Sequence, residues 1–184
     1  MKKLYSLEPP ALPLPAEQAF ARHARFRLRQ DYLDKITRAL ATLDDEQIWW
    51  RPNPACNSIG NLLLHLAGNT RQWLIAGVGG QPDIRARAAE FAAQTGLDKA
   101  ELLARLEDTV NEADEVLAKL AAHTDAEALL QAVIEPQGFP QTVLDAVFHV
   151  IEHFSYHTGQ IVYLAKQLDG ADLRLYDERA LNKE

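Results

Sequence analysis

Apolar residues recur at alternating steps of three and four between positions 98 and 124, and this spacing limits the possible fold most strongly. The residues are Leu103, Leu106, Val110, Ala113, Leu117 and Leu120. Such a seam lies along one face of an α-helix. Asp98, followed three residues later by Glu101, resembles a capping box at the start of that helix. The pattern predicts an amphipathic helix that ends near His123-Thr124.

Three further stretches have helical patterns. The first runs from about Glu17 to Leu43, and the second runs from Asn57 or Ser58, either a good N-cap, to about Gly77. The last starts near Pro140, a suitable first-turn residue, and runs to about Leu168. The segment 129–140 is expected to be extended around Val133-Ile134, without a convincing partner strand. We therefore expect an all-α four-helix bundle, with a long loop between the first and second helices and irregular tails.

Length and composition describe an ordinary globular chain. The 184 residues are enough for one domain with a substantial core, and 47% are hydrophobic and 24% charged. We expect a single domain over 1–184, with its core at about 16–168 and tails at 1–15 and 169–184. Cys56 is the only cysteine, so an internal disulfide is excluded and a reducing compartment is favoured. Prolines interrupt the N-terminus, unlike a signal peptide, and no apolar run is long enough to cross a bilayer. A cytoplasmic protein without a membrane partner is expected.

The net charge of −7 argues against nucleic-acid binding. The first predicted helix is locally basic, but its arginines point in several directions and lack clustered aromatic neighbours. A solvated face is the better interpretation. The turn GVGGQP lacks the Lys-Ser/Thr of a phosphate-binding loop.

Three of the six histidines lie four residues apart in HVIEHFSYHTGQI: His149, His153 and His157. This spacing stacks side chains on one helix face, and the row borders the predicted apolar face. A lone interior histidine usually satisfies itself with one hydrogen bond, but three on one strip favour metal binding, because imidazole suits zinc, nickel, copper and iron. A site also needs a ligand from another helix. His65 lies mid-helix, with Asn61 and Asn69 one turn away on each side; these amides either orient a metal ligand or its bound water, or form a polar patch.

Two motifs resemble those of the DinB-like superfamily of four-helix-bundle metalloenzymes. They are NSIGNLLLHLAGN in the second predicted helix and HVIEHFSYHTGQI in the last, and the loop EQIWWRP is similar to the family's usual lead-in. The resemblance covers the chain from the first helix to about Leu168. It implies one divalent ion in the bundle core, zinc or nickel, held by His65, His153 and His157. His149 would then be a pocket wall or a neighbour of the ligands.

The resemblance also implies that three protein ligands leave coordination positions open, as catalytic sites do. Characterised relatives of this superfamily include transferases and isomerases that use a low-molecular-weight thiol, and others are called hydrolases. We expect a small-molecule substrate, with a thiol as a candidate, and a homodimer. The alternative is a non-catalytic or stress-associated bundle in which the metal is structural. Glu152 and Tyr156 are further candidates for lining the pocket, although an ordinary surface or packing role suits both.

Overall fold

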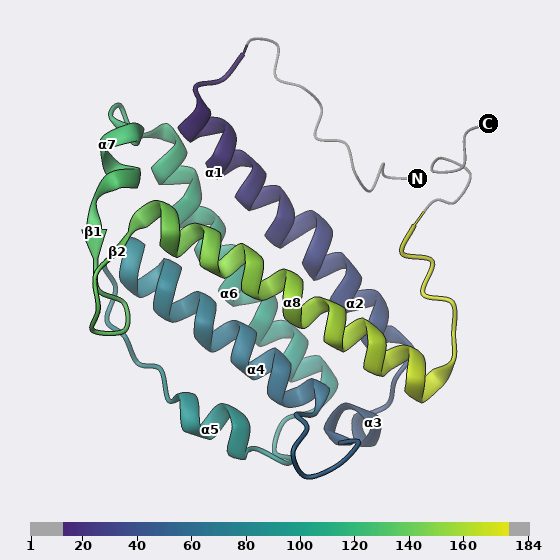
Figure 1. The fold of residues 1–184 in the computed structure, drawn as a ribbon. Coiled ribbons are helices and arrows are strands. Elements are labelled where there is room, and N and C mark those ends of the chain that lie inside the picture. The colour runs from purple at the N-terminus through teal and green to yellow at the C-terminus, as the bar shows by residue number, and fades with distance from the viewer. Residues whose placement is uncertain (1–12, 177–184) are drawn as a thin grey trace, which may run out of the picture.

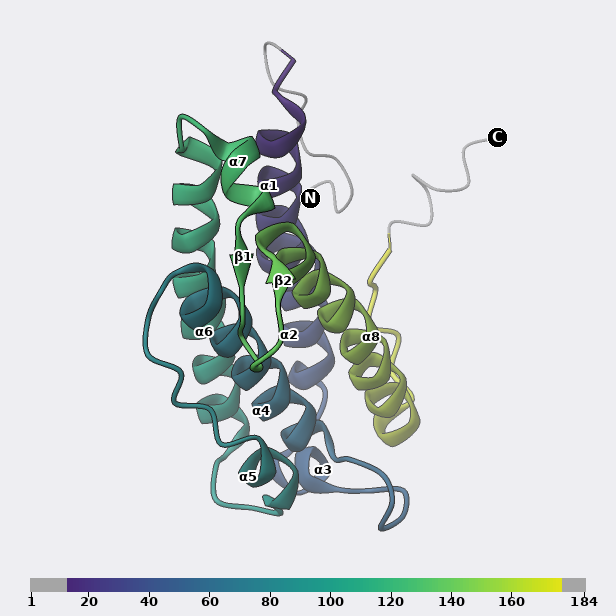
Figure 2. The same ribbon diagram turned by 60° about the vertical axis from the view of Figure 1, so that its left-hand side comes forward.

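The structure, a computed structural model, describes residues 13–176 and is mostly helical (Figure 1). Its first long helical stretch comprises α1 (Ala16–Phe26), the π-helical segment η1 (Arg27–Tyr32) and α2 (Leu33–Ala41), joined without a break because their junction residues keep helical dihedral angles. The second is α4 (Ile59–Thr70) with the π-helical segment η2 (Arg71–Val78). The third is α6 (Lys99–Ala122), and the fourth is α8 (Val143–Asp169). The four stretches lie side by side in both ribbon views (Figures 1 and 2).

Side-chain caps start α4 and α6 where the sequence predicts. Ser58 and Asn61 form a capping box at α4, and Asp98 and Glu101 form one at α6. His123 caps the C-terminal end of α6, and Gly170 ends α8 with a φ of 70°, a left-handed conformation that costs glycine little. The predicted extents of the first three helices are therefore confirmed to within two residues.

The last helix begins later than the predicted start near Pro140. Gln141–Thr142 form strand β2, which pairs antiparallel with β1 (Val133–Ile134), so α8 begins only at Val143. Thr142 is its N-cap, and its hydroxyl accepts a hydrogen bond from the Asp145 amide. The extended prediction at Val133-Ile134 is confirmed, and the expectation that it has no partner strand is wrong.

Three short helices occupy the connections. They are α3 (Asp45–Trp49), α5 (Arg87–Ala92) and α7 (Ala126–Gln131). The predicted long loop before α4 thus contains a helical turn, which Asp44 and Gln47 start with a capping box. Trp49 from this turn packs on Gly60 of α4, where an added Cβ would lie 2.8 Å from its ring.

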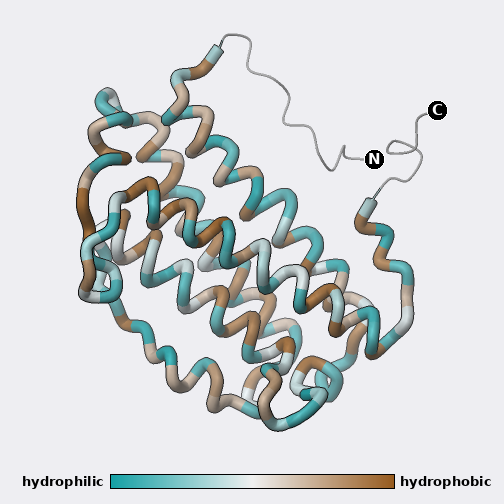
Figure 3. The backbone as a smooth tube through the Cα atoms, viewed as in Figure 1, coloured by the Kyte–Doolittle hydropathy of each residue, from teal (hydrophilic) through white to brown (hydrophobic). Residues whose placement is uncertain are grey.

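The core lies between the four long stretches. In α6 the seam residues from Leu106 to Leu120 are buried as predicted, whereas Leu103 is only partly buried and Leu102 takes its place. Hydrophobic and hydrophilic positions alternate along the long helices (Figure 3). Arg25 and Arg29 on the first stretch both bind Asp114 of α6, so these two arginines join helices rather than only facing solvent.

The predicted tails are described only in part. Residues 1–12 and 177–184 lie outside the described residues. Residues 170–176 have no helix or strand, as expected of a tail, yet Leu173 and Leu175 are each only 6% exposed and belong to the core. Arg38 donates a hydrogen bond to the Arg174 carbonyl and fixes this segment to α2. Between residues 13 and 176, no helix has the length and apolar character needed to span a membrane.

Candidate metal centre

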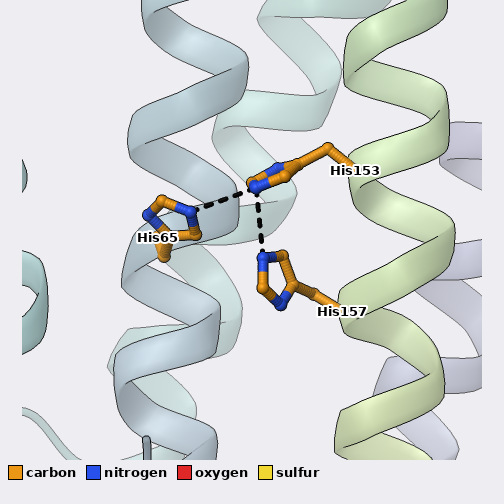
Figure 4. A group of neighbouring side chains, drawn as sticks. All are labelled: His65, His153 and His157. Carbon is orange, nitrogen blue, oxygen red and sulfur yellow. Dashed lines mark hydrogen bonds between the residues drawn. The ribbon is translucent and has the colours of Figure 1, made fainter.

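Three histidine side chains converge between α4 and α8. His65 extends from the middle of α4, and His153 and His157 extend from successive turns of α8 toward it (Figure 4). The Nε2 atom of His153 lies 3.1 Å from the Nε2 atoms of both His65 and His157. One nitrogen from each ring lies within 4.8 Å of the others, so the group could hold a metal ion. The structure thus brings together the three residues predicted as ligands.

A carboxylate fixes the orientation of the His65 ring. The Nδ1 atom of His65 lies 2.8 Å from Oε2 of Glu90, a residue of α5. A carboxylate only accepts hydrogen bonds, so Nδ1 carries the proton and Nε2 presents a lone pair toward α8. Arg85 also lies 3.0 Å from Nδ1, but a protonated nitrogen cannot accept from a guanidinium. The partner of Arg85 is therefore Glu90, which it binds through Nε and Nη2.

Glu90 is held as a buried carboxylate. Burial alone would raise its pKa, but the hydrogen bonds and charges of Arg85 and His65 outweigh that effect and lower the pKa. Gly68 of α4 makes room for this carboxylate, because an added Cβ would lie 2.0 Å from Glu90 Oε1. The close approach of α5 to α4 therefore depends on a glycine one turn beyond His65.

The His157 ring is oriented by a contact within α8. His157 Nδ1 donates to Gln160 Oε1 at 2.6 Å, which leaves its Nε2 as a lone pair. His65 and His157 therefore both present lone pairs to His153 Nε2, which has at most one proton to donate. Ligand nitrogens around a tetrahedral zinc ion lie about 3.3 Å apart, because each Zn–N bond is about 2.0–2.1 Å. The two separations from His153 are close to this value, and all three ligand atoms lie within 4.8 Å of one another, so the group could hold a cation.

The surroundings of the two histidines on α8 favour their neutral forms. Burial, together with the neighbouring His157 and His65, lowers the pKa of His153 to about 3. Burial also lowers the pKa of His157, against the opposing hydrogen bond to Gln160. Since only the neutral imidazole binds a metal ion, these directions keep His153 and His157 in the binding form near neutral pH.

His149 lies one turn away from the trio and contacts it through its ring. It stacks on His153 with ring centroids 5.4 Å apart, and its other neighbour is Trp73 at 4.2 Å. Its Nε2 accepts a hydrogen bond from Asn69 Nδ2 at 3.2 Å. Burial lowers the pKa of His149, although the charge of Glu152 opposes this. His149 therefore lies beside a ligand, as the pocket-wall interpretation expects, and its role remains a prediction.

The two asparagines have partners other than the ligands. Asn61 donates to the carbonyls of Glu90 and Ala93, so it secures the segment that carries Glu90. Asn69 contacts His149 instead. Within the described chain, neither amide has a hydrogen bond to a nitrogen of the trio. Both amides therefore contact neighbours of the trio, and their role, either to orient a ligand or its bound water or to form a polar patch, stays a prediction.

Glu152 and Tyr156 lie on the outer side of α8. Glu152 is exposed, and Tyr156 is 63% exposed with its ring edge-on to that of His157 at 5.0 Å. The other two histidines are remote from the trio, since His23 is exposed on α1 and His123 ends α6. The exposed positions of Glu152 and Tyr156 agree with an ordinary surface role for both side chains.

A polar cavity of about 580 Å³ opens beside the trio. Two members of the trio, His65 and His153, contribute to its wall. The other lining residues are Asn69, Gln72, Arg85, Arg87, Gln137 and His149. The cavity is within the size range of small-molecule sites, about 300–1,000 Å³.

No sequence pattern indicated Glu90 and Arg85, the two charged residues that support His65. They come from the segment 81–96, whose composition is polar and rich in alanine. An arginine and a glutamate five residues apart have no spacing typical of a site. Only the packing of α5 against α4 makes them neighbours of a histidine.

Fold and site together define a mostly helical protein with a histidine cluster able to hold a metal ion. The chain belongs to the family described as "Protein of unknown function (DUF1572)", which it matches over residues 16–177. Comparison with curated proteins gives no match.

Proposed function

We propose that this protein is a metal-dependent enzyme of the four-helix-bundle, DinB-like type that acts on a small molecule. One divalent ion, zinc or nickel, is bound by His65, His153 and His157. The reaction is a thiol-dependent transfer or a hydrolysis. The observation that carries the proposal is the convergence of three imidazole nitrogens from two helices beside a polar cavity.

The chain's own residues prepare the site in defined ways. Glu90 accepts the Nδ1 proton of His65 and Gln160 accepts that of His157, so both rings turn their Nε2 atoms inward. Stacking on His149 holds the ring of His153. A bound divalent ion supplies Lewis acidity, which can activate water or favour the thiolate form of a thiol. The cavity gives a substrate access to the side of the trio formed by His65 and His153.

The alternative is a non-catalytic bundle in which the metal only stabilises the fold. Structural zinc sites are closed by four protein ligands, whereas catalytic sites keep a position open. Within residues 13–176, the cluster contains three ligands and borders a cavity of about 580 Å³. These features favour the catalytic interpretation.

The proposal predicts metal-dependent turnover. Protein stripped of metal and reloaded with Zn²⁺ or Ni²⁺ should catalyse either conjugation of a low-molecular-weight thiol to an electrophile or hydrolysis of an activated ester. Spectrophotometric assays of both reactions measure this, with the stripped protein as the control. A chain that binds metal at the trio but accelerates neither reaction would support the structural alternative.

We also propose that the chain forms a homodimer. Trp50, in the loop before α4, is 42% exposed and offers apolar surface for such an interface together with apolar positions of the first helical stretch. Light scattering at micromolar concentration should give twice the chain mass, and Trp50→Ser should shift the equilibrium toward monomer. A native chain that is monomeric under these conditions contradicts the proposal.

A further inference from the structure

The residues that line the cavity beside the trio include positive charges and no negative one, although the protein is acidic. The chain carries a net charge of −7, yet the cavity is lined by two arginines, Arg85 and Arg87, and by no carboxylate of the described residues. The remaining lining groups are amides and histidines. A divalent ion at the trio would add to this positive charge. The cavity therefore has the electrostatics to attract an anion.

The two arginines differ in how far they are already paired. Arg85 is almost fully buried and is committed to Glu90 and to Gln72 Oε1. Arg87 is exposed at the cavity, and between residues 13 and 176 no carboxylate forms an ion pair with it. The guanidinium of Arg87, unlike that of Arg85, therefore has a positive charge that no described carboxylate neutralises and N–H donors that can bind an anion.

Arg87 is also held in a fixed relation to the metal ligands. Its guanidinium carbon lies 4.9 Å from the ring centroid of Phe91, one helical turn along α5. The Phe91 ring in turn packs on the His65 ring, with centroids 4.6 Å apart. A cation–π contact of this kind orients an arginine without using its outer hydrogen-bond donors. The stack of Arg87, Phe91 and His65 thus places an available guanidinium beside the trio.

We propose that this cavity is an anion subsite, in which Arg87 binds the carboxylate or phosphate group of a small-molecule substrate. The inference deepens the proposed function and rests on it, because the rest of the substrate would extend toward the metal. The planar guanidinium matches both kinds of oxyanion with two parallel hydrogen bonds. Arg87 is therefore assigned a role in substrate specificity, separate from metal binding.

Calorimetric titration of succinate and of inorganic phosphate into the full chain tests this assignment. It should be run on zinc-loaded and on metal-free protein, because Arg87 is not a metal ligand. Arg87→Gln should weaken binding of the preferred anion by about tenfold or more, the loss expected for a charge-assisted bidentate pair. Uncharged succinamide should bind no better to the native chain than to this variant. The anion that binds more tightly shows whether the subsite prefers a carboxylate or a phosphate group.

Arg105→Gln is the matched control. Arg105 is an exposed arginine of α6 in a different cavity, which shares only Arg85 with the anion subsite. Its removal should leave anion affinity unchanged. Metal content, measured in parallel, should be equal in both variants and the native chain. Equal anion binding by native and Arg87→Gln protein, or no binding of either anion at tens of millimolar, overturns the inference. Failure to bind zinc, with Arg87-dependent anion binding retained, would instead contradict the proposed metal site alone.

Discussion

Replacing His153 with alanine should reduce bound zinc from about one ion per chain to almost none, because three-ligand sites tolerate the loss of a ligand poorly. His153 has the central position, with its Nε2 atom 3.1 Å from those of both other histidines. Without it, His65 and His157 remain on different helices with no ring between them. Elemental analysis after zinc loading and gel filtration measures the loss. The metal-dependent rise in melting temperature should disappear with it, since ligand binding to the folded state is what produces such a rise.

His149→Gln is the matched control for this substitution. His149 occupies the same strip of α8 one turn earlier and stacks on His153, but it is not one of the three clustered ligands. Its removal should leave the metal content nearly unchanged, although activity can fall because the ring supports a ligand. His65→Ala, in contrast, should cost metal. The opposite pattern, in which His149 is essential and His65 dispensable, would move the site one turn along α8 and contradict the assignment.

Periodicity predicted the four long helical stretches because each has to bury a continuous apolar face. The seam from Leu106 to Leu120 and the caps at Ser58 and Asp98 are local features, so the sequence alone identifies them. The short elements were not predictable in this way. Strands of two residues, such as Val133–Ile134 with Gln141–Thr142, form only because each supplies the other's hydrogen bonds. This pairing and the Thr142 cap, rather than the proline at 140, set the start of α8.

The candidate site was predictable only in part for a similar reason. A step of four residues turns a helix by about 400°, so the row of histidines drifts by about 40° at each step. Spacing alone therefore places His149, His153 and His157 on one strip without showing which of them meet His65. The resemblance of the last-helix motif selected the later pair, and the structure brings that pair to His65. Glu90 has no such local signal, because its relation to His65 exists only once α5 packs on α4.

Gly68→Ala should weaken zinc binding by about 10–100-fold, the usual range for losing a residue that supports a metal ligand. The added methyl carbon would lie 2.0 Å from Glu90 Oε1 and 2.8 Å from its Cδ, so the carboxylate has to move. Movement breaks the hydrogen bond to His65 Nδ1 and disturbs the ion pair with Arg85. Zinc affinity, measured by competition with a chromophoric chelator, tests this.

Gly159→Ala is the control for the glycine substitution itself. Gly159 also lies inside a helix, α8, but an added Cβ there meets nothing within 4 Å. In a helix interior alanine is favoured over glycine by about 1 kcal/mol, so this variant should keep its zinc affinity and be as stable as the native chain or more so. The double variant Gly68→Ala with Glu90→Ala then isolates the mechanism. If the glycine acts by making room for Glu90, the double variant should bind zinc no more weakly than Glu90→Ala alone, because both changes remove the same interaction. Additive losses would mean that Gly68 supports the site by another route, such as the packing of α4 itself.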